Sequence, residues 1–333
     1  MTVMDTGNTL TIDTRVEELY SPAFWHAHFP RLSINSHLQS WDRDTGVLPS
    51  DTRGLLTERM LEEGYFQDRN ETFAKYAPLL AEAVFTCKTL DIPPAFIFLF
   101  DETWKCFYSL TPMLTHFLGK DYKVLPDFWT WHVDPAQGEA GWRPHRDKGR
   151  QALGPNNVPL SLTVWAPLTE AHPQNGCMYI LPANRDPVYG TEREKDWKVE
   201  LPLIRALPAV PGEYLCWNQA VLHWGSATTR FARHPRLSMA LEFQRGDMRA
   251  FNTPLIQPFA NLKFEDRLRL VGKQILQYKH MYPLAARSLT AILLKLEKEG
   301  RAVRRVQGAD VLQTQEFQGL HVVGHVAVGR VHH

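Results

Sequence analysis

Apolar residues recur at three- and four-residue intervals through much of the first 121 residues of the chain. Charged residues separate them in segments 17–29, 55–66 and 70–90, the pattern of helices with one apolar face. Residues 101–119 continue the pattern, with Asp101 near the start and Gly119 after the end. The pattern predicts a mostly helical N-terminal part over residues 1–121.

From about Tyr122 the pattern changes to short stretches rich in Val, Leu, Tyr, Trp and Phe. Pro, Gly and Asn separate these stretches, as expected for short strands joined by turns. The predicted strands lie within residues 122–133, 160–168, 177–184, 212–218 and 236–244. The sequence therefore predicts a β core over residues 122–247.

Helical periodicity returns after the predicted β core, in segments 264–282 and 285–300. No Gly- or Ser-rich linker divides the chain, so we expect a single domain over residues 1–333, whose last part, 248–333, is a helical extension and tail. An apolar stripe at 289–296 suits either packing on the core or a dimer interface. The expected assembly is a monomer or a homodimer.

Composition narrows the class of protein. Hydrophobic residues make up 44% and charged residues 22%, which is typical of a globular protein with a sizeable core. The net charge of +1 predicts no general attraction to nucleic acid or to membranes. Four scattered cysteines without a CxxC pair, no signal peptide and no run of about 18 apolar residues indicate a cytoplasmic protein.

Candidate chemistry begins at the segment GWRPHRDKGR, residues 141–150, where His145 and Asp147 are separated by one residue. Residues two apart on an extended strand face the same side, so this imidazole and carboxylate can bind one ion. His223 follows an apolar stretch and can supply the third ligand of a two-histidine, one-carboxylate metal site. Arg236, in Arg-Leu-Ser, can bind a dicarboxylic cosubstrate through two parallel hydrogen bonds.

The order HxD…H…RxS on a predicted β background resembles the phytanoyl-CoA dioxygenase family of iron(II)- and 2-oxoglutarate-dependent oxygenases. The segments LTVWAPLTEAHPQNGCMYILPAN and PGEYLCWNQAVLHWGS are similar to the family's core strands, and LLTERMLEEGYF resembles its N-terminal helix. The resemblance covers residues 122–247 well and residues after about 250 hardly at all. It implies a mainly β, double-stranded β-helix fold of jelly-roll or cupin-like type, packed by N- and C-terminal helices in one catalytic domain.

The resemblance also implies the metal ligands and the reaction. His145, Asp147 and His223 would bind Fe(II), with O2 and 2-oxoglutarate as cosubstrates. The enzyme would oxidise an unactivated C–H bond of a small molecule and release succinate and CO2. Family members that halogenate have a small residue in place of the carboxylate, so Asp147 indicates oxygen chemistry, with hydroxylation expected and desaturation or ring closure left open.

The remaining roles concern the cosubstrate and the substrate. The resemblance implies that Arg236, with the Ser238 hydroxyl, binds the far carboxylate of 2-oxoglutarate and that Trp165 lines its pocket. Substrate contacts are expected from Trp131 or His132, although both also fit as ordinary core residues. Arg143, Lys148 and Arg150 would attract an anionic substrate, such as a carboxylate, phosphate or acyl-CoA ester, or form a solvated basic loop.

Two features depart from the family pattern, and two other functions stay open. Gly225 stands where many members have serine, and the segment 182–185 is Pro-Ala-Asn-Arg instead of Pro-Gly-Ser-His. His234 is a rival to His223 as a ligand, but it would crowd Arg236. The alternatives to the oxygenase are a cupin-like metalloenzyme that does not use 2-oxoglutarate and a noncatalytic β-helix binding protein.

Overall fold

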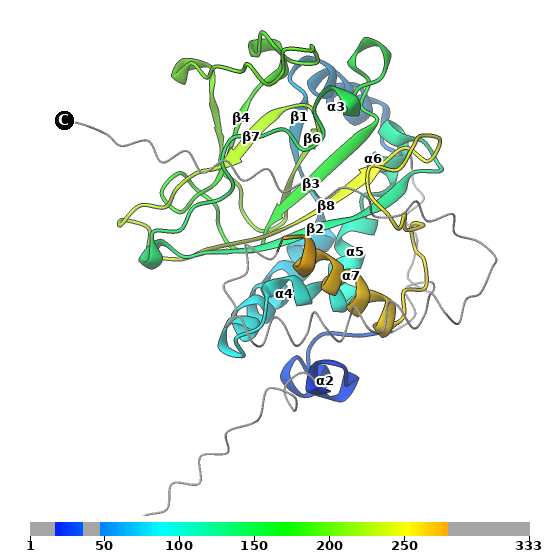
Figure 1. Cartoon of the computed structure of the whole chain (residues 1–333), viewed down its shortest axis with the longest axis vertical. Coiled ribbons are helices and arrows are strands. Elements are labelled where there is room, and N and C mark those ends of the chain that lie inside the picture. Colours follow the sequence, from blue (N-terminus) through cyan, green and yellow to red (C-terminus); the bar gives the residue numbers. More distant parts are fainter. Residues whose placement is uncertain (1–16, 36–46, 279–333) are drawn as a thin grey trace, which may run out of the picture.

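Two antiparallel β-sheets and a layer of helices form the part of the chain that the computed structural model describes, residues 17–35 and 47–278 (Figure 1). The helices are α2 (Pro22–His28), α3 (Ser50–Glu62), α4 (Glu71–Thr89), η2 (Pro94–Leu99), α5 (Asp101–Tyr108), α6 (Thr111–Leu118) and α7 (Phe264–Gln277). The strands are β1 (Tyr65–Arg69), β2 (Lys123–Val133), β3 (Ser161–Pro167), β4 (Met178–Leu181), β5 (Arg205–Leu207), β6 (Glu213–Asn218), β7 (Leu222–Gly225) and β8 (Arg236–Gln244).

The larger sheet has the strand order β1-β6-β3-β8-β2 and the smaller sheet has the order β5-β4-β7. Every pairing within them is antiparallel. Main-chain bridges at His145↔His223 and Ala140↔Ala227 attach the segment before β3 to β7 and to the residues just after it. This attachment places the loop that carries His145 and Asp147 at the edge of the smaller sheet.

The central strands of the larger sheet are buried on both faces. On β3, Val164 belongs to the core between sheet and helices, whereas Trp165 belongs to the core between the two sheets. Leu241 and Ala240 of β8 divide in the same way. Because successive side chains of a strand point to opposite faces, a sheet covered on both sides has nearly continuous apolar strands. Burial on both faces therefore explains why residues 160–168 and 236–244 are mostly apolar.

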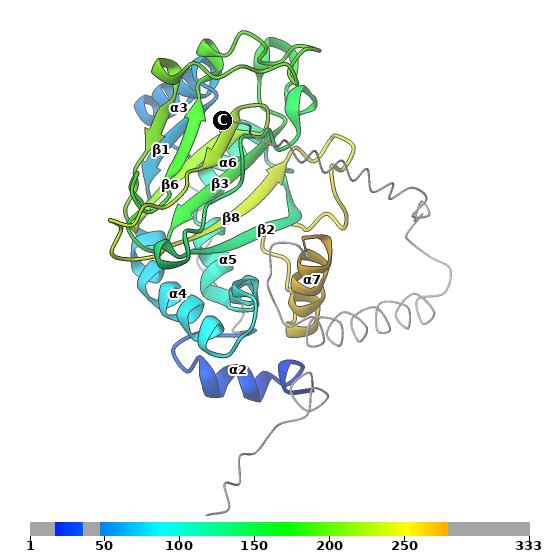
Figure 2. The same ribbon diagram turned by 60° about the vertical axis from the view of Figure 1, so that its left-hand side comes forward.

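Helices cover one face of the larger sheet, and the smaller sheet covers the other. Figure 2 shows α4, α5 and α7 on the same side of β2 and β8, with α2 farther out. The Asn70 side chain caps α4 by accepting hydrogen bonds from the Thr72 and Phe73 amides. The predicted fold class, a double-stranded β-helix with flanking helices, is confirmed.

Two predicted elements differ from the structure. The single helix expected over 101–119 is two helices, α5 and α6, because Pro112 lacks an amide donor and favours the first turn of a new helix. The N-terminal part also contains β1, which pairs with β6. The helix predicted over 285–300, with its apolar stripe, lies outside the described residues.

The helices of the described residues include none with the length and apolar character needed to cross a membrane.

Candidate active site

His145, Asp147 and His223 meet at one point between the two sheets. The Asp147 Oδ1 atom lies 3.4 Å from the Nε2 atoms of both histidines. One side-chain ligand atom from each residue lies within 4.8 Å of the other two, and this is the one such group among residues 17–35 and 47–278. Two main-chain hydrogen bonds of 3.0 Å join His145 and His223 directly, so the two distant segments are fixed side by side.

The two imidazole rings are oriented by backbone carbonyls. The Nδ1 atom of His145 lies 2.7 Å from the Arg143 carbonyl oxygen, and Nδ1 of His223 lies 3.1 Å from that of Val221. A carbonyl can only accept, so each Nδ1 carries the proton and donates it. In the neutral form of each ring, Nε2 therefore carries the lone pair on the side that faces Asp147, the orientation in which histidine binds a metal.

The Asp147 carboxylate is held through its second oxygen. Thr163 Oγ1 and Trp217 Nε1 donate hydrogen bonds to Oδ2 at 2.7 and 3.0 Å, and Gln219 Nε2 donates to Thr163 Oγ1 at 3.0 Å. These contacts leave Oδ1 facing the two histidines. Two imidazole nitrogens and one carboxylate oxygen form a donor set that suits iron(II) and leaves further coordination positions open.

The electrostatics favour the protonation states that bind a metal at His223 and Asp147, but not at His145. Burial lowers the pKa of His223 to about 4, against the opposing effect of Asp147, so this imidazole is neutral at neutral pH. Burial alone would raise the pKa of Asp147, but His223 and His145 outweigh it and hold that pKa below its usual range. Burial would lower the pKa of His145, and Asp147 reverses this and raises it.

Arg236 is a buried cation in the same pocket. Its side chain is 1% exposed, and Nη1 donates to Ser238 Oγ at 2.5 Å. The guanidinium carbon lies 5.8 Å from the centre of the Trp165 ring. Among the described residues Arg236 has no carboxylate within ion-pair distance, and its Nε has no hydrogen-bond partner. A buried guanidinium with unused donors fits a site for a carboxylate ligand.

A pocket of about 450 Å³, part of it open to solvent, contains these groups. Its walls include the three candidate ligands, Arg236 and five tryptophans. The lining residues are Trp129, Trp131, Gly141, Trp142, His145, Asp147, Thr163, Trp165, Met178, Trp217, His223, Gly225, Arg236 and Ala240. Trp131 and Trp165, both singled out from the sequence, therefore line the same pocket as the candidate ligands.

Of the two alternatives for a substrate contact, Trp131 lines the pocket and His132 does not. His132 follows Trp131 on β2, so its side chain points to the opposite face of the sheet. There its Nδ1 lies 3.4 Å from Lys88 Nζ, and its ring meets that of Phe85 edge to face. Both contacts come from α4, and His132 does not line the pocket.

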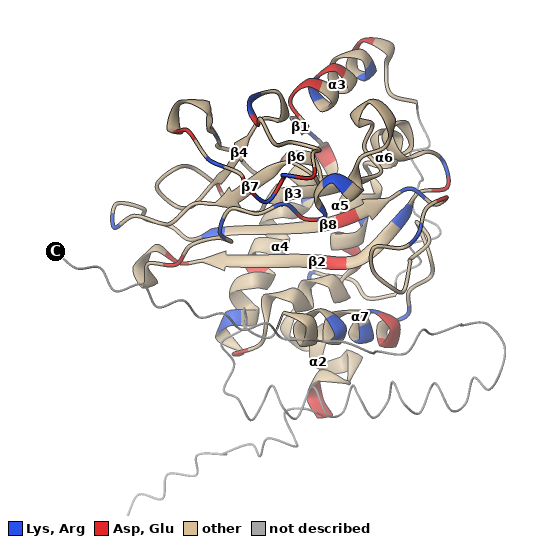
Figure 3. Ribbon diagram, turned by 45° about the horizontal axis from the view of Figure 1, so that its top comes forward, with Lys and Arg blue, Asp and Glu red and all other residues tan. Residues whose placement is uncertain are grey.

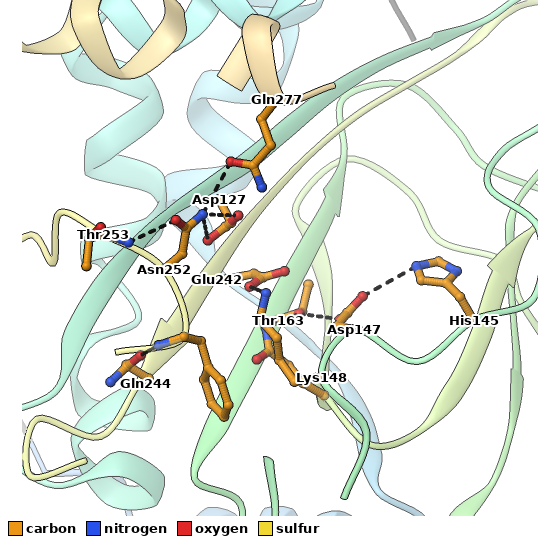
Figure 4. Close-up of polar contacts among 12 residues, drawn as sticks. Asp127, His145, Asp147, Lys148, Thr163, Glu242, Gln244, Asn252, Thr253 and Gln277 are labelled. Atoms are coloured by element: carbon orange, nitrogen blue, oxygen red, sulfur yellow. Dashed lines mark hydrogen bonds and ion pairs between the residues drawn. The ribbon is translucent and has the colours of Figure 1, made fainter. Parts of the chain in front are cut away.

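The basic residues near Asp147 lie outside the pocket lining. Lys148 points away from the pocket and pairs with the buried Glu242 of β8, with 3.0 Å between Nζ and Oε2. Figure 4 shows this pair on the opposite side of Asp147 from His145. The side chain of Arg143 is exposed and does not line the pocket. Arg143 and Lys148 therefore have no contact with the pocket among the described residues.

The two other arginines of the loop are also held by acidic partners. Arg146 is buried against Asp186, with 2.5 Å between Nη2 and Oδ2, and also donates to the Ala220 carbonyl. Arg150 lies 3.4 Å from Glu192 in an exposed pair. Arg146 therefore anchors the loop to neighbouring chain segments, as the alternation of side chains at HxD predicts for the residue between two ligands.

Two sequence features outside the ligand set find explanations. His234 is exposed, so the rival ligand does not reach the pocket. Gly225 packs against the backbone of Gly141: a Cβ at position 225 would lie 2.7 Å from the Gly141 Cα. A serine here would not fit without a shift of the 141 segment, which accounts for this departure from the family pattern.

Sequence reasoning missed three residues of the site. Thr163 and Trp217 orient Asp147, and Trp142 lies against His145 with 5.1 Å between ring centres. Thr163 precedes Trp165 by two residues on β3, so the alternation of a strand predicts that it faces the same pocket. Trp142 lies in an irregular segment, where no such alternation applies.

A family model described as phytanoyl-CoA dioxygenase (PhyH) matches residues 39–234, more than half of the chain. A second model, a β-lactamase-associated winged helix domain, matches residues 278–309, which lie almost entirely outside the described residues. No curated protein sequence matches the chain.

Several solved structures are similar to the chain at low identity. The epimerase SnoN, solved with Fe3+, α-ketoglutarate and nogalamycin RO, is 16% identical over 59% of this chain and 85% of its own, with a TM-score of 0.44. EctD from S. alaskensis, solved with 2-oxoglutarate and 5-hydroxyectoine, is 14% identical over 65% and 82%, with a TM-score of 0.44. The non-heme monooxygenase ThoJ, a nickel complex, is 13% identical over 68% and 97%, with a TM-score of 0.49. Such likeness says nothing about the substrate of this chain.

Proposed function

Because the chain belongs to the phytanoyl-CoA dioxygenase family, an iron- and 2-oxoglutarate-dependent group of oxygenases, we propose that it hydroxylates a C–H bond of a small molecule. His145 and His223 would hold iron(II) through Nε2, and Asp147 through Oδ1. Bound iron(II) supplies the activation of dioxygen, and 2-oxoglutarate supplies the electrons as it is converted to succinate and CO2.

The chain's own residues would orient the reactants and keep them from water. Arg236, held by Ser238, would bind the far carboxylate of 2-oxoglutarate through its fork of donors. Trp165 would form a wall of that subsite, since the guanidinium lies over its ring. The apolar pocket walls would exclude water from the oxidising centre until the substrate is bound.

The observation that carries the proposal is the buried Arg236, which has no carboxylate partner among the described residues and lies in the same pocket as the three candidate ligands. A cupin-like metalloenzyme that does not use 2-oxoglutarate has no need for a buried cation at this point. A noncatalytic binding protein has no need for three ligand atoms gathered within 4.8 Å. Both alternatives leave part of the site unexplained.

The test is succinate formation from 2-oxoglutarate in air with iron(II), measured with and without a library of small molecules. We expect a slow background reaction in the wild-type protein and stimulation by compounds of the right class. His223→Ala should abolish both, whereas His234→Ala, which changes an exposed histidine, should not. If the protein binds iron(II) but consumes no 2-oxoglutarate under any of these conditions, the cupin-like alternative would be favoured.

A further inference from the structure

Three tryptophans line a corner of the pocket that the proposed iron and cosubstrate sites do not use, and a tyrosine packs against two of them. Trp129 and Trp131 lie on the same face of β2, Trp142 lies in the segment before His145, and Tyr278 directly follows α7. We refer to these four residues as the aromatic corner. Its last member lies outside the matched family region, residues 39–234.

The rings of the aromatic corner stand at steep angles to one another. Trp142 meets Trp129 at 73° and Trp131 at 88°, with ring centres 5.8 and 5.7 Å apart. The Tyr278 ring lies 5.6 Å from the rings of both Trp129 and Trp142. Rings set edge to face present faces in different directions, so a group bound in the corner can contact more than one ring face.

The aromatic corner lies beside the candidate metal centre. The centres of the Trp142 and His145 rings are 5.1 Å apart, and Trp129, Trp131 and Trp142 line the same pocket as His145. Trp131 and Trp142 are only partly buried, so their rings remain accessible from solvent. A substrate group held here would place its neighbouring carbon atoms near the iron.

The corner lacks a positive charge of its own. Arg236 is the one Lys or Arg among the described residues that lines the pocket, and its proposed role is at the cosubstrate. Lys148 pairs with Glu242, and Lys273 of α7 donates to Asn252 and Gln277. Neither lysine lines the pocket.

Buried carboxylates lie behind the corner. β2 and β8 each carry one acidic residue, visible as a red segment in each strand in Figure 3, and these are Asp127 and Glu242. Asp127 accepts two hydrogen bonds from Asn252, beside Gln277 (Figure 4). Burial raises the pKa of the Tyr278 hydroxyl, and the charges of Asp127, Glu242 and Asp147 raise it further. Asp127 therefore contributes negative charge near Tyr278, whereas the charge of Glu242 is compensated by Lys148.

We propose that the aromatic corner binds a cationic ammonium group of the substrate. Aromatic faces attract such cations through their quadrupoles, most strongly where water is excluded. The proposal replaces the anionic substrate expected from the composition of residues 141–150. It rests on the proposed function only in taking the bound molecule to be the substrate, because the binding itself needs no turnover.

The test compares three probes of nearly equal shape and different charge: choline, 3,3-dimethylbutan-1-ol and 3,3-dimethylbutanoate. Binding is measured by calorimetry without oxygen, on protein loaded with iron(II) and 2-oxoglutarate and again on metal-free protein. We expect choline to bind about tenfold more tightly than the neutral alcohol, and the anion to bind least. The measurement on metal-free protein separates a failure of this proposal from a failure of the iron site.

Variants assign the binding to the corner. Trp142→Ala should remove most of the preference for choline, and Trp142→Phe should restore part of it. Trp197→Ala, which changes a partly exposed tryptophan outside the pocket, should leave it unchanged. Equal binding of choline and the alcohol, tighter binding of the anion, or no binding of choline would each overturn the proposal.

Discussion

At the scale of single residues, Arg236 and Asp147 depend on specific contacts. The guanidinium is fully buried next to Ser238 and Trp165, and burial lowers its pKa to about 10. A charge in this position is costly unless an anion joins it. The Asp147 carboxylate, by contrast, already accepts two hydrogen bonds on Oδ2, which leaves Oδ1 for the metal.

Arg236→Lys tests the cosubstrate contact. One ammonium replaces two parallel donors, so the concentration of 2-oxoglutarate needed for half-maximal binding should rise by roughly tenfold to a hundredfold, about 1.5–3 kcal/mol. The measurement is anaerobic titration of the iron-loaded protein with 2-oxoglutarate, with the exposed Arg233→Lys as control. If the Arg236 variant needs the same 2-oxoglutarate concentration for half-maximal binding as the wild type, Arg236 does not bind the cosubstrate.

Trp217→Phe tests the orientation of Asp147. The change keeps an aromatic ring next to His223 but deletes the donor that lies 3.0 Å from Asp147 Oδ2. Loss of a hydrogen bond to a metal-binding carboxylate should weaken iron(II) binding about tenfold or more. Anaerobic titration with iron(II) measures this, and Thr163→Val, which removes the other donor, should act in the same direction. Normal iron affinity in both variants would mean that Asp147 needs no such support.

The sequence could identify some residue roles and not others. The roles of His145 and Asp147 could be predicted because their spacing alone places them on one side of an extended segment. The partner of Lys148 could not be predicted. Glu242 lies far along the chain, and only the register of β8 beside β3 brings it next to Lys148. A lysine in a basic segment therefore suggested a substrate contact, although it forms a buried ion pair.

At the scale of elements, the loop carrying Asp147 is fixed to both sheets. The bridge between His145 and His223 joins it to β7, and Lys148 joins it to Glu242 on β8. Burial raises the pKa of Glu242 to about 8, against the opposing effect of Lys148, so this carboxyl depends on its partner to be charged. The ion pair ties the loop to the larger sheet directly behind the candidate metal ligand.

Lys148→Met should destabilise the protein because it leaves Glu242 buried without its cation. Removing one partner of a buried ion pair costs about 3–5 kcal/mol, measurable as a lower free energy of unfolding in urea. The double variant Lys148→Met with Glu242→Leu should recover much of this loss, because no unpaired charge remains. A single variant as stable as the wild type would show that the pair does not hold the loop.

The predicted elements failed where local pattern and tertiary context disagree. Five strands of the core were predictable because their apolar, β-branched and aromatic residues lie between turn residues. The five-residue strand β1 was not, since it follows α3 directly and is defined by its pairing with β6. The break between α5 and α6 has a local signal, Pro112, which the continuous apolar periodicity outweighed in the prediction.

At the scale of the whole molecule, the candidate site joins parts that lie far apart in the sequence. The loop before β3, the smaller sheet through His223 and the larger sheet through Arg236 all contribute to one pocket. Tyr278, after α7, packs against Trp129 and Trp142 of the pocket. The two sheets thus carry the groups proposed for the metal and the cosubstrate, and the residue after the C-terminal helix supports the tryptophans proposed to bind the substrate.

Anaerobic calorimetric titration of the metal-free protein with iron(II) tests the central claim most directly. The account predicts one binding site per chain, lost in His145→Ala, Asp147→Ala and His223→Ala and retained in His234→Ala. Undiminished iron binding in the His223→Ala protein, or equal loss in the His234→Ala control, would contradict it.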